Sequence, residues 1–134
     1  MAEIRYRVGN DLDFEQYLAV YVQSTLGERR PVADPERMRR MLEEANLVVT
    51  AWDGGEMVGI ARSLTDFVYA TYLSDLAVKV SHQKSGIGRE LMRRTQLEAP
   101  RATLILLSAP AAEKYYPHVG FTQHHSAWIK KAGE

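Results

Sequence analysis

The sequence predicts a mixed α/β sheet with the element order β-α-α-β-β-β-α-β-α-β, on three observations. Residues 47–64 contain two β-rich runs on either side of Asp53-Gly54-Gly55, a strong hairpin signal. Residues 69–109 contain a strand pattern, a polar glycine-containing loop, a helix pattern and a second strand pattern, which is the order of a right-handed parallel crossover. Within that unit, residues 104–107 are a continuous apolar run, typical of a strand buried on both faces.

The N-terminal third predicts one strand and two helices. Residues 3–8 alternate between polar and apolar and form the strand, and Asn10 or Asp11 then caps the first helix. The apolar residues that follow have helical spacing: Phe14, Tyr17, Leu18, Tyr21 and Val22. The second helix begins with Asp34 as its cap and Pro35 in its first turn, and its apolar stripe ends near residue 45.

The other elements follow from the same patterns. We expect strands at 47–52, 57–64, 69–80, 102–109 and 121–129, and helices at about 86–98 and 110–116.

Composition restricts the function classes. The chain has 134 residues, 17 Lys and Arg, 17 Asp and Glu, and no cysteine. We therefore expect one domain spanning residues 1–134, without disulfides or cysteine-based metal sites. The balanced charge argues against nucleic acid as a partner, and no apolar run approaches the ~20 residues of a membrane helix. No signal-peptide pattern begins the sequence, so we expect a cytoplasmic protein without a membrane partner.

The zero net charge conceals a local gradient. Residues 46–76 carry one base and four acids, or 1 − 4 = −3, whereas residues 77–101 carry six bases and two acids, or 6 − 2 = +4. A basic segment in a neutral protein points to a small anionic ligand or to a solvated helix face.

A phosphate-binding pattern lies in this basic segment. Gly86 and Gly88 sit where a polar loop becomes a helix, and Lys84 and Arg89 flank them. Such a helix start offers unpaired N–H groups and the positive end of the helix dipole, and glycine lets a phosphate approach the backbone. A dinucleotide fingerprint is excluded because Leu91 stands where a third small residue is needed, and the Gly-Lys-Ser/Thr of a P-loop is absent.

The spacing Gln83-x-x-Gly86-x-Gly88 after a strand ending at Val78 resembles the pyrophosphate signature of the GNAT superfamily of acyl-CoA-dependent N-acetyltransferases. Tyr116, four residues before the pair Gly120-Phe121, also matches a common feature of that family. The resemblance covers nearly the whole chain. It implies the GNAT mixed central sheet, with a splay between two parallel strands around the pyrophosphate loop.

The resemblance implies acetyl-CoA as co-substrate. The loop N–H groups would hold its pyrophosphate, its pantetheine arm would lie between the strands ending at Val78 and Ser108, and the N–H of Ala77 or Val78 would polarise the thioester carbonyl. Ser108 is either a helix cap or a pantetheine contact. The implied binding residues are Ala77, Val78, Gln83, Lys84, Ser85, Gly86, Ile87, Gly88, Arg89 and Ser108.

The resemblance also implies residues for proton transfer. Tyr116 is our candidate general acid, because a phenol with a pKa of ~10 is protonated at neutral pH. Pro117 departs from the family pattern, so Tyr115 remains an alternative. Asp75 is the candidate base or orienting group for the amine, and a purely structural carboxylate is the other interpretation.

The expected function is N-acetylation of a primary amine by direct attack in a ternary complex, with a non-catalytic acyl-CoA-binding module as the alternative. The acceptor is open, and Asp66 and Asp75 favour a cationic one. A homodimer is a further expectation, because small acetyltransferases often pair through their last strands. No metal is expected, because His118, His124 and His125 match no zinc spacing.

Overall fold

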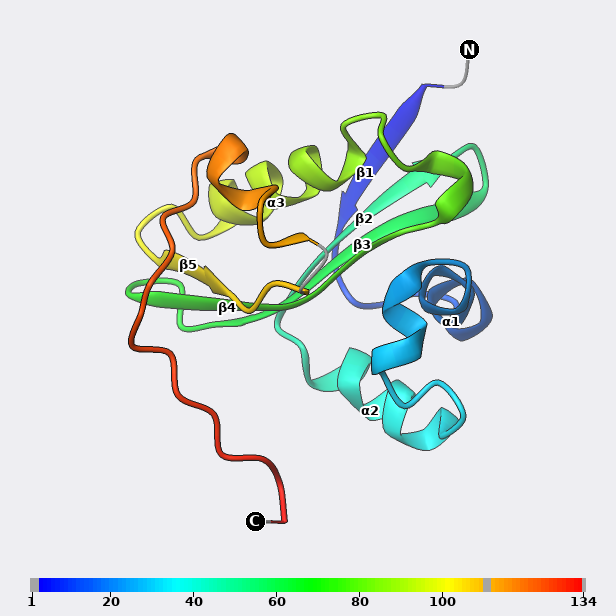
Figure 1. The fold of residues 1–134 in the computed structure, drawn as a ribbon. Helices are drawn as coiled ribbons and strands as arrows, with labels where there is room; N and C mark the ends of the chain where they lie inside the picture. The colour runs from blue at the N-terminus through cyan, green and yellow to red at the C-terminus, as the bar shows by residue number, and fades with distance from the viewer. Residues whose placement is uncertain (1–2, 110–111, 134) are drawn as a thin grey trace.

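The structure is a computed structural model that describes residues 3–109 and 112–133. In these residues the centre is a five-stranded sheet of order β1-β2-β3-β4-β5 (Figure 1). The strands are β1 (Ile4–Val8), β2 (Leu47–Asp53), β3 (Glu56–Thr65), β4 (Ala70–Val78) and β5 (Thr103–Leu106). Strands β1 to β4 pair antiparallel with their neighbours, and β4 and β5 pair in parallel. The predicted mixed sheet is confirmed.

Three α-helices accompany the strands in the described ranges: α1 (Phe14–Val22), α2 (Pro35–Glu44) and α3 (Ile87–Glu98). The predicted cap of α2 is confirmed, because Asp34 accepts the N–H of Arg37 at 3.2 Å. The predicted cap of α1 is wrong. Asp13 accepts the N–H of Gln16 at 2.9 Å, while the Asn10 side chain donates to carbonyls at the end of α2.

The helices cover both faces of the sheet. Figure 1 shows α3 on one face and α1 with α2 on the other. Tyr17, Tyr21 and Met38 of α1 and α2 are fully buried in one cluster with residues of β2, β3 and β4. Leu91 of α3 is buried in a second cluster, against Val58 and other sheet residues. Residues of β3 and β4 belong to both clusters, so these two strands are packed between helices on both faces of the sheet.

The two parallel strands part as the resemblance implied. Their pairing runs from Ala70 with Thr103 to Leu73 with Leu106, and β4 then continues to Val78. The end of β4 is therefore paired with β3 on one edge and faces a gap on the other.

The C-terminal expectations need correction. Strand β5 ends at Leu106, short of the expected 102–109, and it is not buried on both faces because the Ile105 side chain is 49% exposed. Residues 110 and 111 of the expected helix lie outside the described residues, and the 3-10 helix η4 (Tyr116–Val119) follows them. The expected strand at 121–129 is absent, since the polar run 123–126 breaks the alternation that buries one strand face. This segment extends away from the sheet, with Trp128 91% exposed (Figure 1).

No described helix has the length and apolar character needed to cross a membrane.

Candidate active site

A cavity of about 150 Å³ lies in the gap between β4 and β5. Its lining comes from the 3-10 helix η1 (Thr25–Arg29) and its neighbours, the end of β4, the following loop, and the chain from β5 onward. The residues are Ser24, Thr25, Leu26, Arg29, Arg30, Leu73, Ser74, Leu76, Ala77, Val78, Gln83, Leu106, Leu107, Ala109, Ala112 and Tyr116. The cavity thus lies between the parted strands and the segment that joins α1 to α2, and of the glycine loop (residues 83–89) only Gln83 lines it.

The glycine loop (residues 83–89) leads into α3 without a side-chain cap at the N-terminus of the helix. Lys84 and Gly86 adopt left-handed backbone angles, with φ of 63° and 85°, and no side chain caps the helix. A Cβ on Gly86 would meet nothing within 4 Å, whereas one on Gly88 would make ordinary contacts with Val78 at 3.9 Å and Leu76 at 4.0 Å. The first N–H groups of α3 therefore have no side-chain cap, and they stay available to a bound phosphate.

Side chains hold this loop in shape. The Gln83 amide donates to the carbonyl of Val78 at 2.9 Å, so it ties the loop to the end of β4. The Ser85 hydroxyl donates to the carbonyl of His82 at 2.6 Å, and Ile87 is buried in the cluster beneath α3. Each of these contacts positions backbone and leaves the helix start accessible.

The charges near the helix start suit an anion. Lys84 and Arg89 are exposed. Glu90 lies in the first turn of α3, but Arg93 at 2.7 Å and Arg94 at 2.6 Å bind its carboxylate. Hydrogen bonds from Arg93 and Arg94 lower the pKa of Glu90 to about 2, so the carboxylate is ionised and paired.

Two adjacent tyrosines, Tyr115 and Tyr116, differ in exposure and in their relation to the cavity. Tyr116 lines the cavity and packs against Phe121, with ring centroids 5.5 Å apart. Tyr115 is 41% exposed and is not among the lining residues. Burial raises the pKa of the Tyr116 hydroxyl, the neighbouring Tyr115 adds to this, and the charge of Arg29 acts in the opposite direction. The Tyr116 phenol therefore stays protonated at neutral pH.

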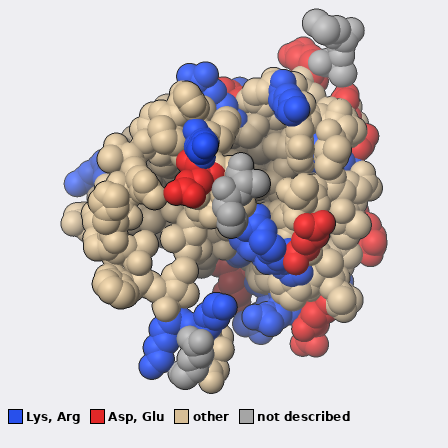
Figure 2. Space-filling model, viewed as in Figure 1, with Lys and Arg blue, Asp and Glu red and all other residues tan. Residues whose placement is uncertain are grey.

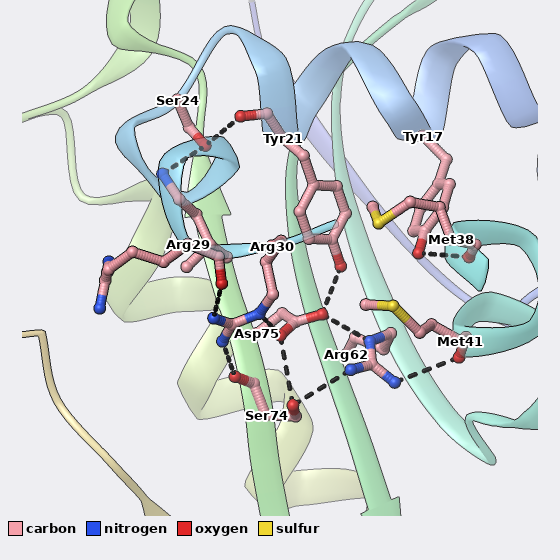
Figure 3. Close-up of polar contacts among 11 residues, drawn as sticks. Tyr17, Tyr21, Ser24, Arg29, Arg30, Met38, Met41, Arg62, Ser74 and Asp75 are labelled. Atoms are coloured by element: carbon pink, nitrogen blue, oxygen red, sulfur yellow. Dashed lines mark hydrogen bonds and ion pairs between the residues drawn. The ribbon is translucent and has the colours of Figure 1, made fainter. Parts of the chain in front are cut away.

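Asp75 lies in a buried ionic cluster with Arg30 and Ser74, two residues of the cavity lining (Figure 3). Its Oδ2 accepts from Arg62 Nε at 2.5 Å and from the Tyr21 hydroxyl at 2.6 Å. Its Oδ1 accepts from Arg30 Nε at 2.7 Å and from the Ser74 hydroxyl at 3.2 Å. A carboxylate has about four acceptor positions, so these four donors fill it.

The cluster also determines the charge of Asp75. Burial alone would raise the pKa of this carboxyl, but the hydrogen bonds and charges of Arg62, Tyr21 and Arg30 hold the pKa below its ordinary value. The side chain is fully buried and is not among the lining residues of the cavity. It is therefore an ionised anchor between β4, β3 and the segment after α1.

The other predicted residues divide by position. Ala77 and Val78 line the cavity, whereas Ser108 is exposed and is not among the lining residues. The N–H of Lys79 donates to Val58 in β3 at 2.9 Å. Because successive strand residues direct their N–H groups to opposite edges, we expect the N–H of Val78 to face the gap and that of Ala77 to face β3.

The histidines lie apart from the cavity. His118 belongs to η4, and His124 and His125 are exposed in the chain that follows. Across the ranges 3–109 and 112–133, no three His, Asp or Glu side chains gather as a metal site would need.

Comparison with known proteins places this chain in a family. Residues 18–133 match the sequence model of the acetyltransferase (GNAT) domain, which is most of the chain. The chain belongs to the GNAT acetyltransferase family. A search of curated proteins finds no match to it.

Solved structures of other GNAT proteins share the fold. A GNAT-family acetyltransferase from Streptococcus pneumoniae is 21% identical, with a TM-score of 0.75 over 96% of this chain and 99% of that one. The aminoglycoside N-acetyltransferase AAC(6')-Iy in complex with CoA is 15% identical, with a TM-score of 0.76 over 98% and 97%. An aminoglycoside acetyltransferase from an uncultured soil sample, in complex with sisomicin, is 15% identical, with a TM-score of 0.70 over 96% and 94%.

Sequence reasoning missed four residues at or beside this candidate site. Arg29 and Arg30 are visible in the sequence as part of a charged helix break, and nothing in that pattern places them at the cavity. Arg62 and Tyr21 bind Asp75 from β3 and α1, residues distant in the sequence. An arginine in an otherwise apolar strand was the available signal, because such a charge is buried only when paired.

Proposed function

We propose that this chain transfers an acetyl group from acetyl-CoA to an amine by direct attack in a ternary complex. The observation that carries the proposal is the cavity between the parted strands, which has Gln83 of the glycine loop and Tyr116 among its lining residues. The GNAT membership supports acetyl transfer as the reaction class. The sequence offers no cysteine for a cysteinyl intermediate, which favours direct attack.

The glycine loop would hold the coenzyme. The N–H groups of residues 84–89 and the dipole of α3 would bind the pyrophosphate, with Lys84 and Arg89 adding charge. The pantetheine arm of the coenzyme would lie along Val78, in the gap between β4 and β5. The N–H of Val78, rather than that of Ala77, would donate to the thioester oxygen, where negative charge develops in the transition state.

Tyr116 would supply the proton that the departing thiolate takes up. Its position in the cavity supports this role, and the phenol is protonated at neutral pH, as an acid must be before it transfers a proton. Tyr115 is the weaker candidate, since it lies outside the lining.

Asp75 would act as a positioning residue rather than as the base. Its acceptor positions are filled by two arginines, a tyrosine and a serine, so binding a proton would require breaking the cluster. The same contacts hold Arg30, and with it the segment after α1, against β4. Deprotonation of the amine would then occur through water or before binding.

Calorimetric titration with acetyl-CoA, followed by a thiol-release assay with a panel of amines, tests the proposal. We expect binding by the wild-type chain and by Gly86→Ala, and loss of binding by Gly86→Glu, whose carboxylate would face the pyrophosphate. The alanine variant is the matched control, because both substitutions strain the left-handed backbone of residue 86. Binding without thiol release from any amine would identify a non-catalytic acyl-CoA-binding protein. Absence of binding at saturating acetyl-CoA would refute the proposal.

A further inference from the structure

The charged residues at the cavity are of one sign. Among the described lining residues, Arg29 and Arg30 are charged and none is acidic. Glu28 belongs to the same 3-10 helix but is exposed and does not line the cavity. Figure 2 shows Lys and Arg side chains near the centre of this face, with acidic side chains beside them. The acidic pair proposed from sequence to attract a cation does not serve the cavity: Asp75 is buried in its cluster, and Asp66 binds backbone N–H groups in the β3–β4 turn.

The buried cluster leaves an excess of positive charge beneath the cavity. Arg30 and Arg62 share the single carboxylate of Asp75, so the cluster sums to 2 − 1 = +1, and the exposed Arg29 of the cavity lining adds one more positive charge outside the cluster. The Arg62 side chain is only 8% exposed, so water screens this charge weakly. An anion at the cavity would offset the excess, and a cation would add to it.

The two cavity arginines differ in how they are held. Arg30 is fixed by Asp75, by the carbonyl of Ser74 at 2.8 Å and by the carbonyl of Arg29 at 2.8 Å. No described residue accepts a hydrogen bond from the Arg29 guanidinium, and Figure 3 shows its side chain directed away from the cluster. Arg29 is exposed and lines the cavity, as Tyr116 does. The planar guanidinium of Arg29 is thus unpaired, and its N–H donors can bind a carboxylate or a phosphate in a bidentate manner.

We propose that the acceptor is an amine that also carries an anionic group, a carboxylate or a phosphate, and that Arg29 binds this group beside the fixed charge of Arg30. The inference rests on the proposed acetyl transfer and assigns its substrate class. It separates this chain from the structural neighbours described as aminoglycoside acetyltransferases, because a polycationic acceptor would meet unpaired positive charge at the cavity.

The test compares matched acceptors in the thiol-release assay: phenylalanine with phenylalaninamide, phosphoethanolamine with ethanolamine, and sisomicin as the polycation. At a given pH, phenylalaninamide has a larger fraction of unprotonated, nucleophilic amine than phenylalanine. A preference for phenylalanine must therefore come from the protein. We expect at least a tenfold higher kcat/KM for one anionic member over its neutral partner, the range of a hydrogen bond between charged groups. The preferred pair distinguishes carboxylate from phosphate.

Arg29→Gln is the decisive variant, with Arg101→Gln, an exposed arginine away from the cavity lining, as its control. We expect Arg29→Gln to lower kcat/KM for the anionic acceptor about 10- to 100-fold, with little change for its neutral partner and an unchanged acetyl-CoA affinity by calorimetry. Equal or better use of neutral or polycationic acceptors by the wild-type chain would overturn the inference while leaving acetyl transfer intact. Weakened acetyl-CoA binding with an unchanged acceptor preference would also overturn it, because Arg29 would then serve the coenzyme.

A binding measurement keeps the inference testable if no acceptor is turned over. Saturation-transfer NMR on the wild-type chain with acetyl-CoA present would compare the same acceptor pairs. Binding of the anionic member that disappears in Arg29→Gln supports the inference even if acetyl transfer fails. Equal binding of both members, or binding of neither, refutes it.

Discussion

Replacing Asp75 with asparagine tests the buried ionic cluster. The change keeps the shape of the side chain but removes the charge that neutralises Arg62, which is only 8% exposed, and Arg30, which is 24% exposed. Removing one partner of a buried pair costs about 3–5 kcal/mol of unfolding free energy. That is a large part of the roughly 5–15 kcal/mol that stabilises a typical domain.

Urea unfolding at neutral pH measures this loss. With a slope of about 2 kcal/mol per molar, the midpoint of Asp75→Asn should fall by roughly 1.5–2.5 M. Asp66→Asn is the matched control. It removes the same charge from an exposed turn and retains the Oδ1 that accepts all three backbone N–H groups, so its midpoint should move far less. A midpoint change for Asp75→Asn equal to that of the control would refute the cluster as a stabilising element.

The pH dependence of stability gives the cluster a second signature. The folded-state pKa of Asp75 lies below its unfolded value of about 3.9, so the stability it contributes is present above that value and is lost as the pH falls through the folded-state pKa. The wild-type and Asp75→Asn stabilities should therefore converge in strong acid. A constant difference down to the acid limit would show that the effect is not linked to this carboxyl.

The remaining predictions concern the loop and the general acid. Gly88→Ala should raise the unfolding free energy by about 0.5–1 kcal/mol in thermal melts, because the added Cβ makes only ordinary contacts in a helix. Gly86→Ala should lower the unfolding free energy by about 1–2 kcal/mol, because its φ of 85° is left-handed; equal effects at both positions would contradict this. Tyr116→Phe should keep acetyl-CoA affinity but lower kcat about 100-fold or more, while Tyr115→Phe changes kcat little. The opposite order would assign the acid role to Tyr115.

Local patterns predicted the parts of the fold that depend on neighbouring residues. The turn at Asp53-Gly54-Gly55 and the start of α3 at Gly86 were both visible, because each requires particular residues within a few positions. The expected strand at 121–129 failed for a different reason. The polar run 123–126 interrupts the alternation, and pairing also depends on whether a sheet edge accepts the strand, which a short sequence window does not show.

In the candidate site, too, local sequence predicted some features, and others depend on tertiary contacts. The loop around Gly86 was visible as a motif, but the role of Asp75 depends on Tyr21, Arg30 and Arg62, which come from other elements. A lone carboxylate in an apolar strand has the same sequence pattern whether it is a base or an anchor. Its burial and its four donors favour the anchor, and these are tertiary properties.

Mass spectrometry of a reaction with isotope-labelled acetyl-CoA tests the central claim most directly. The wild-type chain would be incubated with the labelled coenzyme and the acceptor panel, and both the small molecules and the intact protein would be measured. We expect the label on the amine of an acceptor, in amounts equal to the free coenzyme A released, and none on the protein. Label retained on the protein as an intermediate, or no acetylated amine from any acceptor, would contradict direct acetyl transfer in a ternary complex.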